Sequence, residues 1–179
     1  MTAPTLPNGD ETGIGDISLF DLFLFKAGAG LELGVGPVLV IPTAEEDVLG
    51  QGKWQAGIST VAIAPQKWGL LGALVIYQQS FAGDDDRHDV QQLSVQPFVI
   101  YNLPHGYYLR SSGIATFEFE QDNHDIPIGL GVGKVWLLSS GATLNTFAGP
   151  QYTVWQEGTG TPKWQIFAGI NMQFPIGGH

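Results

Sequence analysis

The chain of 179 residues contains no cysteine, which excludes disulfide bonds, thiol catalysis and thiolate metal sites. Charge is scarce as well, since charged residues make up 13% of the chain against roughly 25% in an ordinary soluble domain. The net charge of −10 disfavours non-specific binding to nucleic acid or to anionic lipid surfaces. No apolar run suits a helical membrane span, because Gln, Asn, Gly and Pro interrupt the charge-free runs 90–109 and 135–156.

In place of charge, the chain carries 25 glycines and many Ser, Thr, Gln and Asn residues beside a hydrophobic fraction of 44%. This mixture is typical of a barrel with one face in lipid and the other in a polar lumen. The first residues have neither a basic start nor an apolar core, so we expect the signal peptide to be absent from this chain. We predict a flexible N-terminal segment over 1–13, one barrel domain over 14–175 and a C-terminal tail over 176–179.

Hydrophobicity alternates with a period of two along most of the chain. Leu31, Leu33 and Val35 alternate with Glu32 and Gly34. The segments from Val90 to Tyr101 and from Trp164 to Phe174 repeat this pattern. Such alternation is the pattern of β-strands and does not fit the spacing of a helix.

The pattern predicts about nine long antiparallel strands in an all-β, up-and-down transmembrane β-barrel. Strands in soluble proteins usually have about 5–6 residues, so the predicted lengths favour a membrane barrel. An antiparallel barrel closes with an even number of strands, so a count of nine leaves three explanations. One strand is miscounted, the chain is part of a larger barrel, or the edge strands pair between copies. The predicted ranges are 15–26, 30–42, 53–65, 68–82, 89–103, 106–120, 125–138, 142–156 and 163–175.

Short and long connections alternate, so all short turns fall at one end of the meander and all long loops at the other. The long loops carry the acids, and we expect them to be external loops, as in outer-membrane barrels. Aromatic residues cluster near the predicted strand ends, which favours girdles at the two membrane interfaces. The acidic loop residues are Glu45, Glu46, Asp47, Asp84, Asp85, Asp86 and Asp89.

Four ordered blocks resemble the bacterial outer-membrane family named for the meta-pathway of phenol degradation, whose members are described as transporters. The resemblance runs from about Gly13 to the end of the chain. It implies an exported barrel, further N-terminal strands and a link to aromatic compounds, and it supplies no catalytic residues. The blocks are Ile41–Trp54, Ser80–Arg87, Gln96–Leu109 and Ile126–Lys134.

Five polar residues are candidates for the lumen of the barrel. Opposed charges that line a pore set its selectivity through the local field, although they could equally serve only to fill and solvate a narrow lumen. Asp21 and Lys134 do not fit the alternation, unless a bulge intervenes or Lys134 reaches the interface. The lumen candidates are Glu32, Gln96, Arg110, Glu118 and Glu120.

The sequence predicts neither an enzyme nor a metal or cofactor site. The run from Asp84 to Asp89 lacks the spacing and glycine of an EF-hand loop, and the four histidines form no zinc-binding pair. No serine lies in a nucleophile-elbow pattern. The glycines at 129, 131 and 133 have a period of two, which indicates a strand that packs closely rather than a phosphate loop.

We therefore expect an outer-membrane channel or transporter for small solutes, aromatic or hydrophobic ones among them. Its partners would be the lipid bilayer, the solute, the outer-membrane assembly machinery and, in one reading, further copies of the chain. The alternatives are a soluble, lipocalin-like barrel that binds an apolar ligand and a surface barrel without transport. The lipocalin-like alternative requires the apolar strand faces to point inward.

Overall fold

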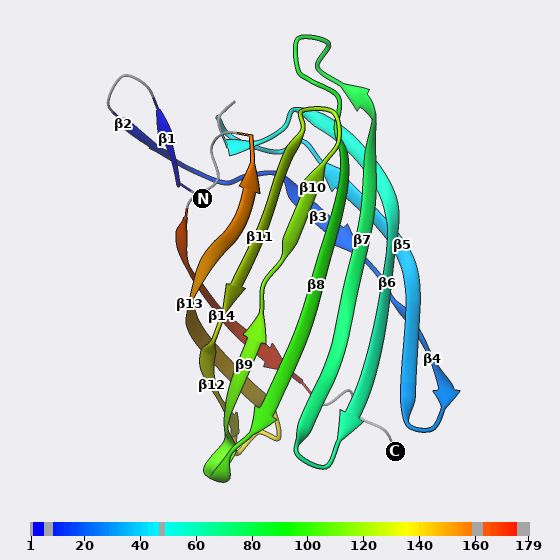
Figure 1. Cartoon of the computed structure of the whole chain (residues 1–179), viewed down its shortest axis with the longest axis vertical. Helices are drawn as coiled ribbons and strands as arrows, with labels where there is room; N and C mark the ends of the chain where they lie inside the picture. The colour runs from blue at the N-terminus through cyan, green and yellow to red at the C-terminus, as the bar shows by residue number, and fades with distance from the viewer. Residues whose placement is uncertain (1, 6–8, 47–48, 159–162, 175–179) are drawn as a thin grey trace.

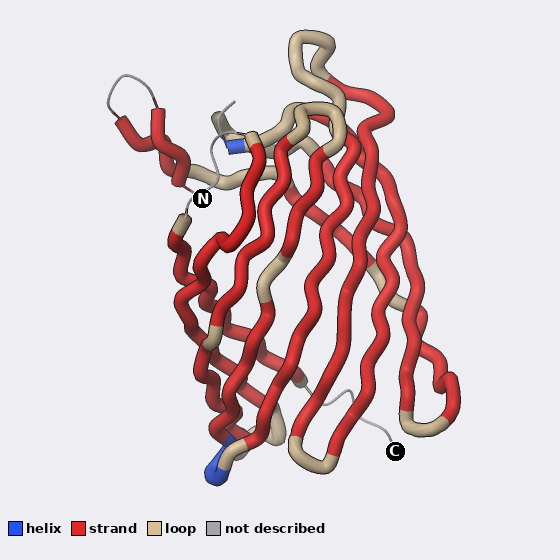
Figure 2. The backbone as a smooth tube through the Cα atoms, in the orientation of Figure 1, coloured by secondary structure: helices blue, strands red, loops and turns tan. Residues whose placement is uncertain are grey.

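The computed structural model describes residues 2–5, 9–46, 49–158 and 163–174. Almost all regular structure in this part of the chain is β-sheet, and it contains no α-helix. Long strands run side by side and curve around a common interior (Figure 1), and strand dominates the whole path of the backbone (Figure 2). The chain is an all-β protein with an antiparallel, barrel-like fold, as the alternation predicted.

One large sheet contains twelve strands, and β1 (Thr2–Thr5) and β2 (Gly9–Thr12) form a separate two-stranded sheet. These eight residues lie within the predicted N-terminal segment 1–13, whose flexibility stays a prediction. The strands of the large sheet are β3 (Ile17–Phe20), β4 (Phe23–Gly28), β5 (Leu31–Ile41), β6 (Lys53–Gln66), β7 (Gly69–Gly83), β8 (Gln91–Asn102), β9 (Tyr107–Ser112), β10 (Ala115–Glu118), β11 (Asn123–Gly129), β12 (Gly131–Leu137), β13 (Thr143–Glu157) and β14 (Trp164–Gln173).

Three pairs of these strands are halves of one segment. β3 and β4 both pair with β5, β9 and β10 both pair with β8, and β11 and β12 both pair with β13. Counted in this way, the meander has the nine segments that the sequence predicted, with bounds within a few residues. Asp21, which did not fit the alternation, lies in the interruption between β3 and β4.

The short turns and the long loops lie at opposite ends of the sheet, as Figure 1 shows. The β4–β5 turn is tight because Gly28, Ala29 and Gly30 all have positive φ, at 91°, 51° and 79°. At the β8–β9 turn, a 3-10 helix labelled η2 (Pro104–Gly106) reverses the chain. The alternation of short and long connections is thus the geometry of an up-and-down meander.

The first and last segments are edges of the sheet. Among the described residues, β14 pairs only with β13, and β3 and β4 pair only with β5. Both edge segments run from the long-loop end to the short-turn end because an antiparallel meander of nine segments returns to its starting direction. A ladder between them would therefore be parallel, unlike every other pair in the sheet.

The polar residues of the long strands lie mostly on the inner face, where apolar residues accompany them, and the outer face is mainly apolar. On β5, Val38 and Val40 are 5% and 4% exposed, whereas Val35 on the other side is 38% exposed. The same outward face continues to Ile58 of β6 and to Ile128 of β11, which are 49% and 57% exposed. This orientation is the reverse of the one that a lipocalin-like barrel needs.

Aromatic rings lie over glycines of the neighbouring strand on the inner face. A Cβ atom at Gly133 would lie 2.1 Å from the Tyr108 ring, and one at Gly72 would lie 2.3 Å from the Phe98 ring. Gly169 has the same relation to Phe147, at 2.5 Å. Gly72, Gly133 and Gly169 make room for flat aromatic packing, whereas Gly129 and Gly131 lie close to the backbone of β13.

Candidate functional site

The interior divides into a polar half near the long loops and a more apolar half near the short turns. The half near the long loops is called the upper half and the half near the short turns the lower half. The cross-strand registers place Gln55, Gln78 and Ser94 on the inner face of the upper half. In the lower half, the same face carries Val61, Leu74, Phe98 and Ile100, listed from β6 to β8. A solute inside the barrel would meet hydrogen-bonding groups first and apolar groups further down.

Three glutamines linked by hydrogen bonds lie at the upper end of the polar half. The Gln78 amide donates to Gln55 Oε1 at 2.8 Å, and the Gln55 amide donates to Gln51 Oε1 at 2.5 Å. Gln55 is 0% exposed. Because a buried amide without partners is costly, these hydrogen bonds fix the side chains at the upper end of the wall.

The loop between β5 and β6 is tied down beside the mouth of the barrel. The Asp16 carboxylate accepts the N–H of Gln51 at 2.7 Å and that of Ala44 at 3.3 Å. From the other side, the Arg87 guanidinium donates to the carbonyl groups of Gly50 and Gln51. These contacts from two distant segments hold the loop in place.

A cavity of about 520 Å³ lies at the mouth, beside this loop. Glu118 lines it and is 7% exposed. Glu118 Oε1 accepts the N–H groups of Gln91 and Glu120 at 2.9 and 3.2 Å, whereas Oε2 is buried without a hydrogen-bond partner in the described part of the chain. The other polar residues that line the cavity are Gln51, Asp86, Arg87, His88, Gln92, Gln121 and Asn123.

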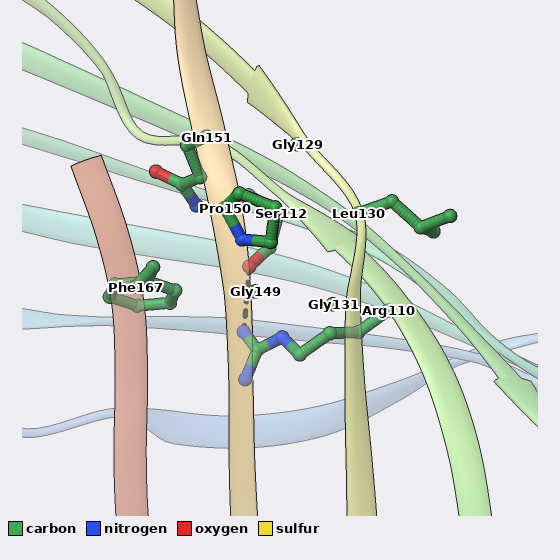
Figure 3. A pocket seen from close by; sticks show the side chains of 9 residues that line it. All are labelled: Arg110, Ser112, Gly129, Leu130, Gly131, Gly149, Pro150, Gln151 and Phe167. Carbon is green, nitrogen blue, oxygen red and sulfur yellow. Dashed lines mark hydrogen bonds between the residues drawn. The ribbon is translucent and has the colours of Figure 1, made fainter. Parts of the chain in front are cut away.

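Arg110 lies flat against the inner wall rather than across the lumen. Its side chain extends from β9 over Gly131 and Gly149 toward β13 (Figure 3), and one guanidinium nitrogen donates to Ser112 Oγ at 2.6 Å. The guanidinium carbon lies 3.8 Å from the centre of the Phe147 ring. The adjoining cavity measures about 10 Å³, which leaves room for about one water molecule.

The predicted lumen residues do not form one cluster. Gln96 and Glu32 lie on the inner face, where Gln96 pairs with Leu74 and Glu32 pairs with Lys26 near the short turns. Arg110 and Glu118 share a face of the β9–β10 segment, but eight residues separate them by roughly 26 Å. The interior therefore holds separate charged positions at different depths.

Glu120 is a correction to the predicted lumen set. The β10 strand ends at Glu118, and Glu120 lies exposed in the following turn. The alternation would have placed it inward if the strand had continued by two more residues. Its backbone N–H contributes instead to the position of the Glu118 carboxylate.

The acidic loop residues that the structure describes all lie at the long-loop end, and Asp47 lies outside the described residues. Asp89 pairs with Lys53 at 3.2 Å, and hydrogen bonds from Lys53 and Ser80 lower the pKa of this carboxyl from its ordinary value of 3.8. Glu45 accepts the N–H of Ile14, and Asp84 accepts that of Asp86. Glu46 and Asp85 are exposed.

The outer face carries aromatic residues at both ends of the strands. His124 stacks on Trp155 near the loops, with ring centres 5.9 Å apart, and Trp68 stacks on Tyr101 near the short turns, also at 5.9 Å. The alternation did not predict that His124 would join an aromatic cluster. The outward position of Lys134 follows from its pairing with Tyr107 on β9, and its ammonium group reaches the Tyr107 hydroxyl at 3.2 Å.

No group of three or more His, Cys, Asp or Glu residues suited to a metal ion occurs in the described segments. In these segments there is also no helix long and apolar enough to cross a membrane. The sequence matches no family model, no curated protein and no solved structure at a significant level. The resemblance to the meta-pathway family therefore stays a prediction.

Proposed function

We propose that this chain is a β-barrel of the bacterial outer membrane that passes or binds small solutes in its lumen. The observation that carries the proposal is the exposure, in the part of the chain that the structure describes, of 35 large apolar or aromatic side chains, most of them on the outer faces of the strands. Soluble monomers rarely expose a contiguous apolar patch above about a few hundred Å². Lipid around the barrel would cover this surface.

The aromatic residues at the two ends of the outer face support the same reading. Trp54 and Trp155 lie toward the long loops, and Trp68, Tyr107 and Trp136 lie toward the short turns. Rings of this kind are enriched at the two interfaces of a bilayer. The strands of 11 to 15 residues from β5 to β8 are long enough to span between these levels.

The interior favours solutes with an apolar body and a polar end. The upper half offers amide and carboxylate groups, including Glu118, and the lower half offers Phe98 and Leu74. This division agrees with the small aromatic or hydrophobic solutes that the family resemblance implies. A soluble lipocalin-like barrel is disfavoured because its outer surface would have to be the polar one.

Two edges need a partner if the sheet lies in lipid, because unpaired backbone groups are not tolerated there. The edges are β14 on one side and β3 with β4 on the other. Parallel pairing between these edges, further strands or a second copy of the chain would each satisfy them. The bilayer and the outer-membrane assembly machinery are the remaining proposed partners.

Refolding with and without detergent micelles tests the proposal. We expect a β-rich form that appears only with detergent and migrates differently on gels before and after boiling. Circular dichroism would follow the secondary structure in parallel. A monodisperse β-protein in plain buffer would contradict the membrane assignment.

Solute flux into proteoliposomes tests the lumen. Leu74→Trp narrows the interior, whereas Val75→Trp changes the neighbouring outward position on the same strand. We expect the first variant to slow the uptake of small solutes severalfold and the second to leave it unchanged. A folded, inserted protein that passes no solute would favour a surface barrel without transport.

A further inference from the structure

An apolar groove lies on the outer face near the short turns, away from the lumen. It measures about 560 Å³, a size that suits a bound small molecule or acyl chain. Ala148 is flanked in the sheet by Val132 and Ala168, so small side chains form its floor. Other residues that line the groove are Trp136, Thr146 and Ile170.

A positively charged side chain lies at this groove. Lys134 lines it, and the ammonium nitrogen lies 4.3 Å from the centre of the Tyr107 ring and 5.3 Å from that of Trp136. One of its hydrogen bonds goes to the Tyr107 hydroxyl, at 3.2 Å. Among the described residues, no carboxylate lies within ion-pair distance of Lys134, so none of these residues neutralises its charge through an ion pair.

The surroundings favour an anionic occupant at this end of the barrel despite the net charge of −10. The acidic loops lie at the opposite end, whereas Lys67 flanks a short turn at the same end as Lys134. Lys26 lies at this end too, where it pairs in the sheet with Glu32. At a separation of more than about 10 Å, salt largely screens the field of the distant acids. Tyr107 and Trp136 mark the depth at which headgroups meet the hydrocarbon.

We propose that the groove binds an anionic phospholipid, with one acyl chain along Ala148 and Ala168 and its headgroup, which carries a net negative charge, on Lys134. This inference rests on the proposed membrane location. The apolar lining suits an acyl chain, and a lysine held beside two aromatic rings can donate to phosphate oxygens without being drawn into lipid. The occupant is one lipid of defined orientation, more tightly held than the general lipid around the barrel.

The test uses Trp136 as a reporter at the groove. A variant that retains Trp136, with the other four tryptophans changed to phenylalanine, is inserted into phosphatidylcholine vesicles. A small equal fraction of brominated phosphatidylglycerol or brominated phosphatidylcholine is then added. We expect the anionic lipid to quench Trp136 at least twofold more strongly than the zwitterionic one.

Two further changes separate the headgroup from the acyl chain. Lys134→Gln should abolish the preference for phosphatidylglycerol, whereas Lys67→Gln, a matched loss of charge at a turn, should preserve it. Ala168→Leu fills the floor of the groove and should reduce quenching by both lipids. Circular dichroism would verify that each variant retains the β-form.

Equal quenching by both lipids, or a preference that survives Lys134→Gln, would overturn the lipid site while leaving the membrane assignment intact. Trp136 shielded from both lipids in a cross-linkable dimer would overturn it as well, because a second copy would then occupy the groove. A chain that stays in water and never inserts would refute the proposed function instead. The three results are distinguishable in one set of vesicle preparations.

Discussion

The two halves of the sheet differ in how continuous their strands are. From β5 to β8 the strands run for 11 to 15 residues without a break, and one register shift occurs, between Trp54 and Gln55. From β9 to β14 the strands are interrupted near Gly113 and at Leu130, and the register shifts between Ile126 and Pro127. We call these halves the continuous wall and the interrupted wall.

The continuous wall is the regular scaffold of the sheet, and the interrupted wall carries the more specialised surfaces. Long uninterrupted ladders give the continuous wall its regular backbone, and its inner face ends in the Gln51–Gln55–Gln78 chain. The interrupted wall carries Arg110 stacked on Phe147 on its inner face and the Lys134 groove on its outer face. Breaks and glycines let side chains approach the backbone of this wall, which is where a ligand or lipid can be held.

Substitutions that place a charge on the outer face should give the largest loss of stability. If the outer face lies in lipid, as proposed, Ile58→Arg in the continuous wall and Ile128→Arg in the interrupted wall should each destabilise the folded barrel by ~2–4 kcal/mol. Gln96→Arg, which faces the interior, is the matched control and should cost less. Urea unfolding in vesicles measures the three values, and a cost for only one wall would show that the other does not face lipid.

Glycine substitutions come next, and they distinguish a glycine that faces a backbone carbonyl from one that faces an aromatic ring. Gly57→Ala in the continuous wall directs a methyl group at the Tyr77 carbonyl oxygen, 1.9 Å away, whereas Gly133→Ala directs one at the Tyr108 ring. Each change should cost ~1–3 kcal/mol through overpacking. A second substitution can shorten the Tyr108 side chain, but no substitution can remove the Tyr77 backbone carbonyl.

Tyr108→Leu should therefore restore much of the stability lost by Gly133→Ala, whereas no side-chain change on β7 should rescue Gly57→Ala. A double-mutant cycle with urea unfolding gives the coupling energy. Additive losses at Gly133 and Tyr108 would mean that the ring does not lie over the glycine. The Tyr108 hydroxyl also donates to Asn145, so the single Tyr108→Leu variant is part of the cycle.

The smallest effect is expected at the Lys53–Asp89 pair on the rim of the continuous wall, where the Lys53 side chain is 10% exposed and that of Asp89 is 71% exposed. Because the pKa of Asp89 is lowered in the folded chain, its stabilising contribution is present above pH 3.8 and is lost as the pH falls through the lowered pKa. Asp89→Asn should thus unfold slightly more easily than the parent chain at pH 7, and this difference should shrink as the pH falls below 3.8. Asp85→Asn removes the same charge without this ion pair, and an equal pH dependence in both variants would contradict the assignment.

Strand positions and face orientation could be predicted because they depend on local patterns. Leu93, Val95 and Val99 alternate with Gln92, Ser94 and Gln96, and this period of two is a property of the extended backbone. The predicted bounds failed where a strand stopped early, as at Glu120, because a turn with Asp122 at a φ of 49° replaced the continued alternation. The strand break at Leu130 also left no clear signal, since the surrounding glycines suit a strand as well as a bend.

The sites depended on contacts that no local pattern contains. Glu118 was predicted to face inward, but its buried Oε2 atom depends on the loops that surround the mouth. The position of Arg110 between Phe147 and Gly131 depends on the registers of β9, β12 and β13. Lys134 did not fit the alternation of polar and apolar residues, and only the tertiary structure shows that its ammonium group lies beside the Tyr107 and Trp136 rings on the outer face.

The sequence by itself determined the all-β class, the nine segments and the two ends of the meander, because alternation, turn residues and loop acids act over a few neighbouring positions. The tertiary structure decided which edges stay unpaired, where the charged side chains lie along the interior, and where small residues of β12 to β14 leave a groove. These features follow from the registers between strands, since the stagger of one strand against the next sets which side chains meet.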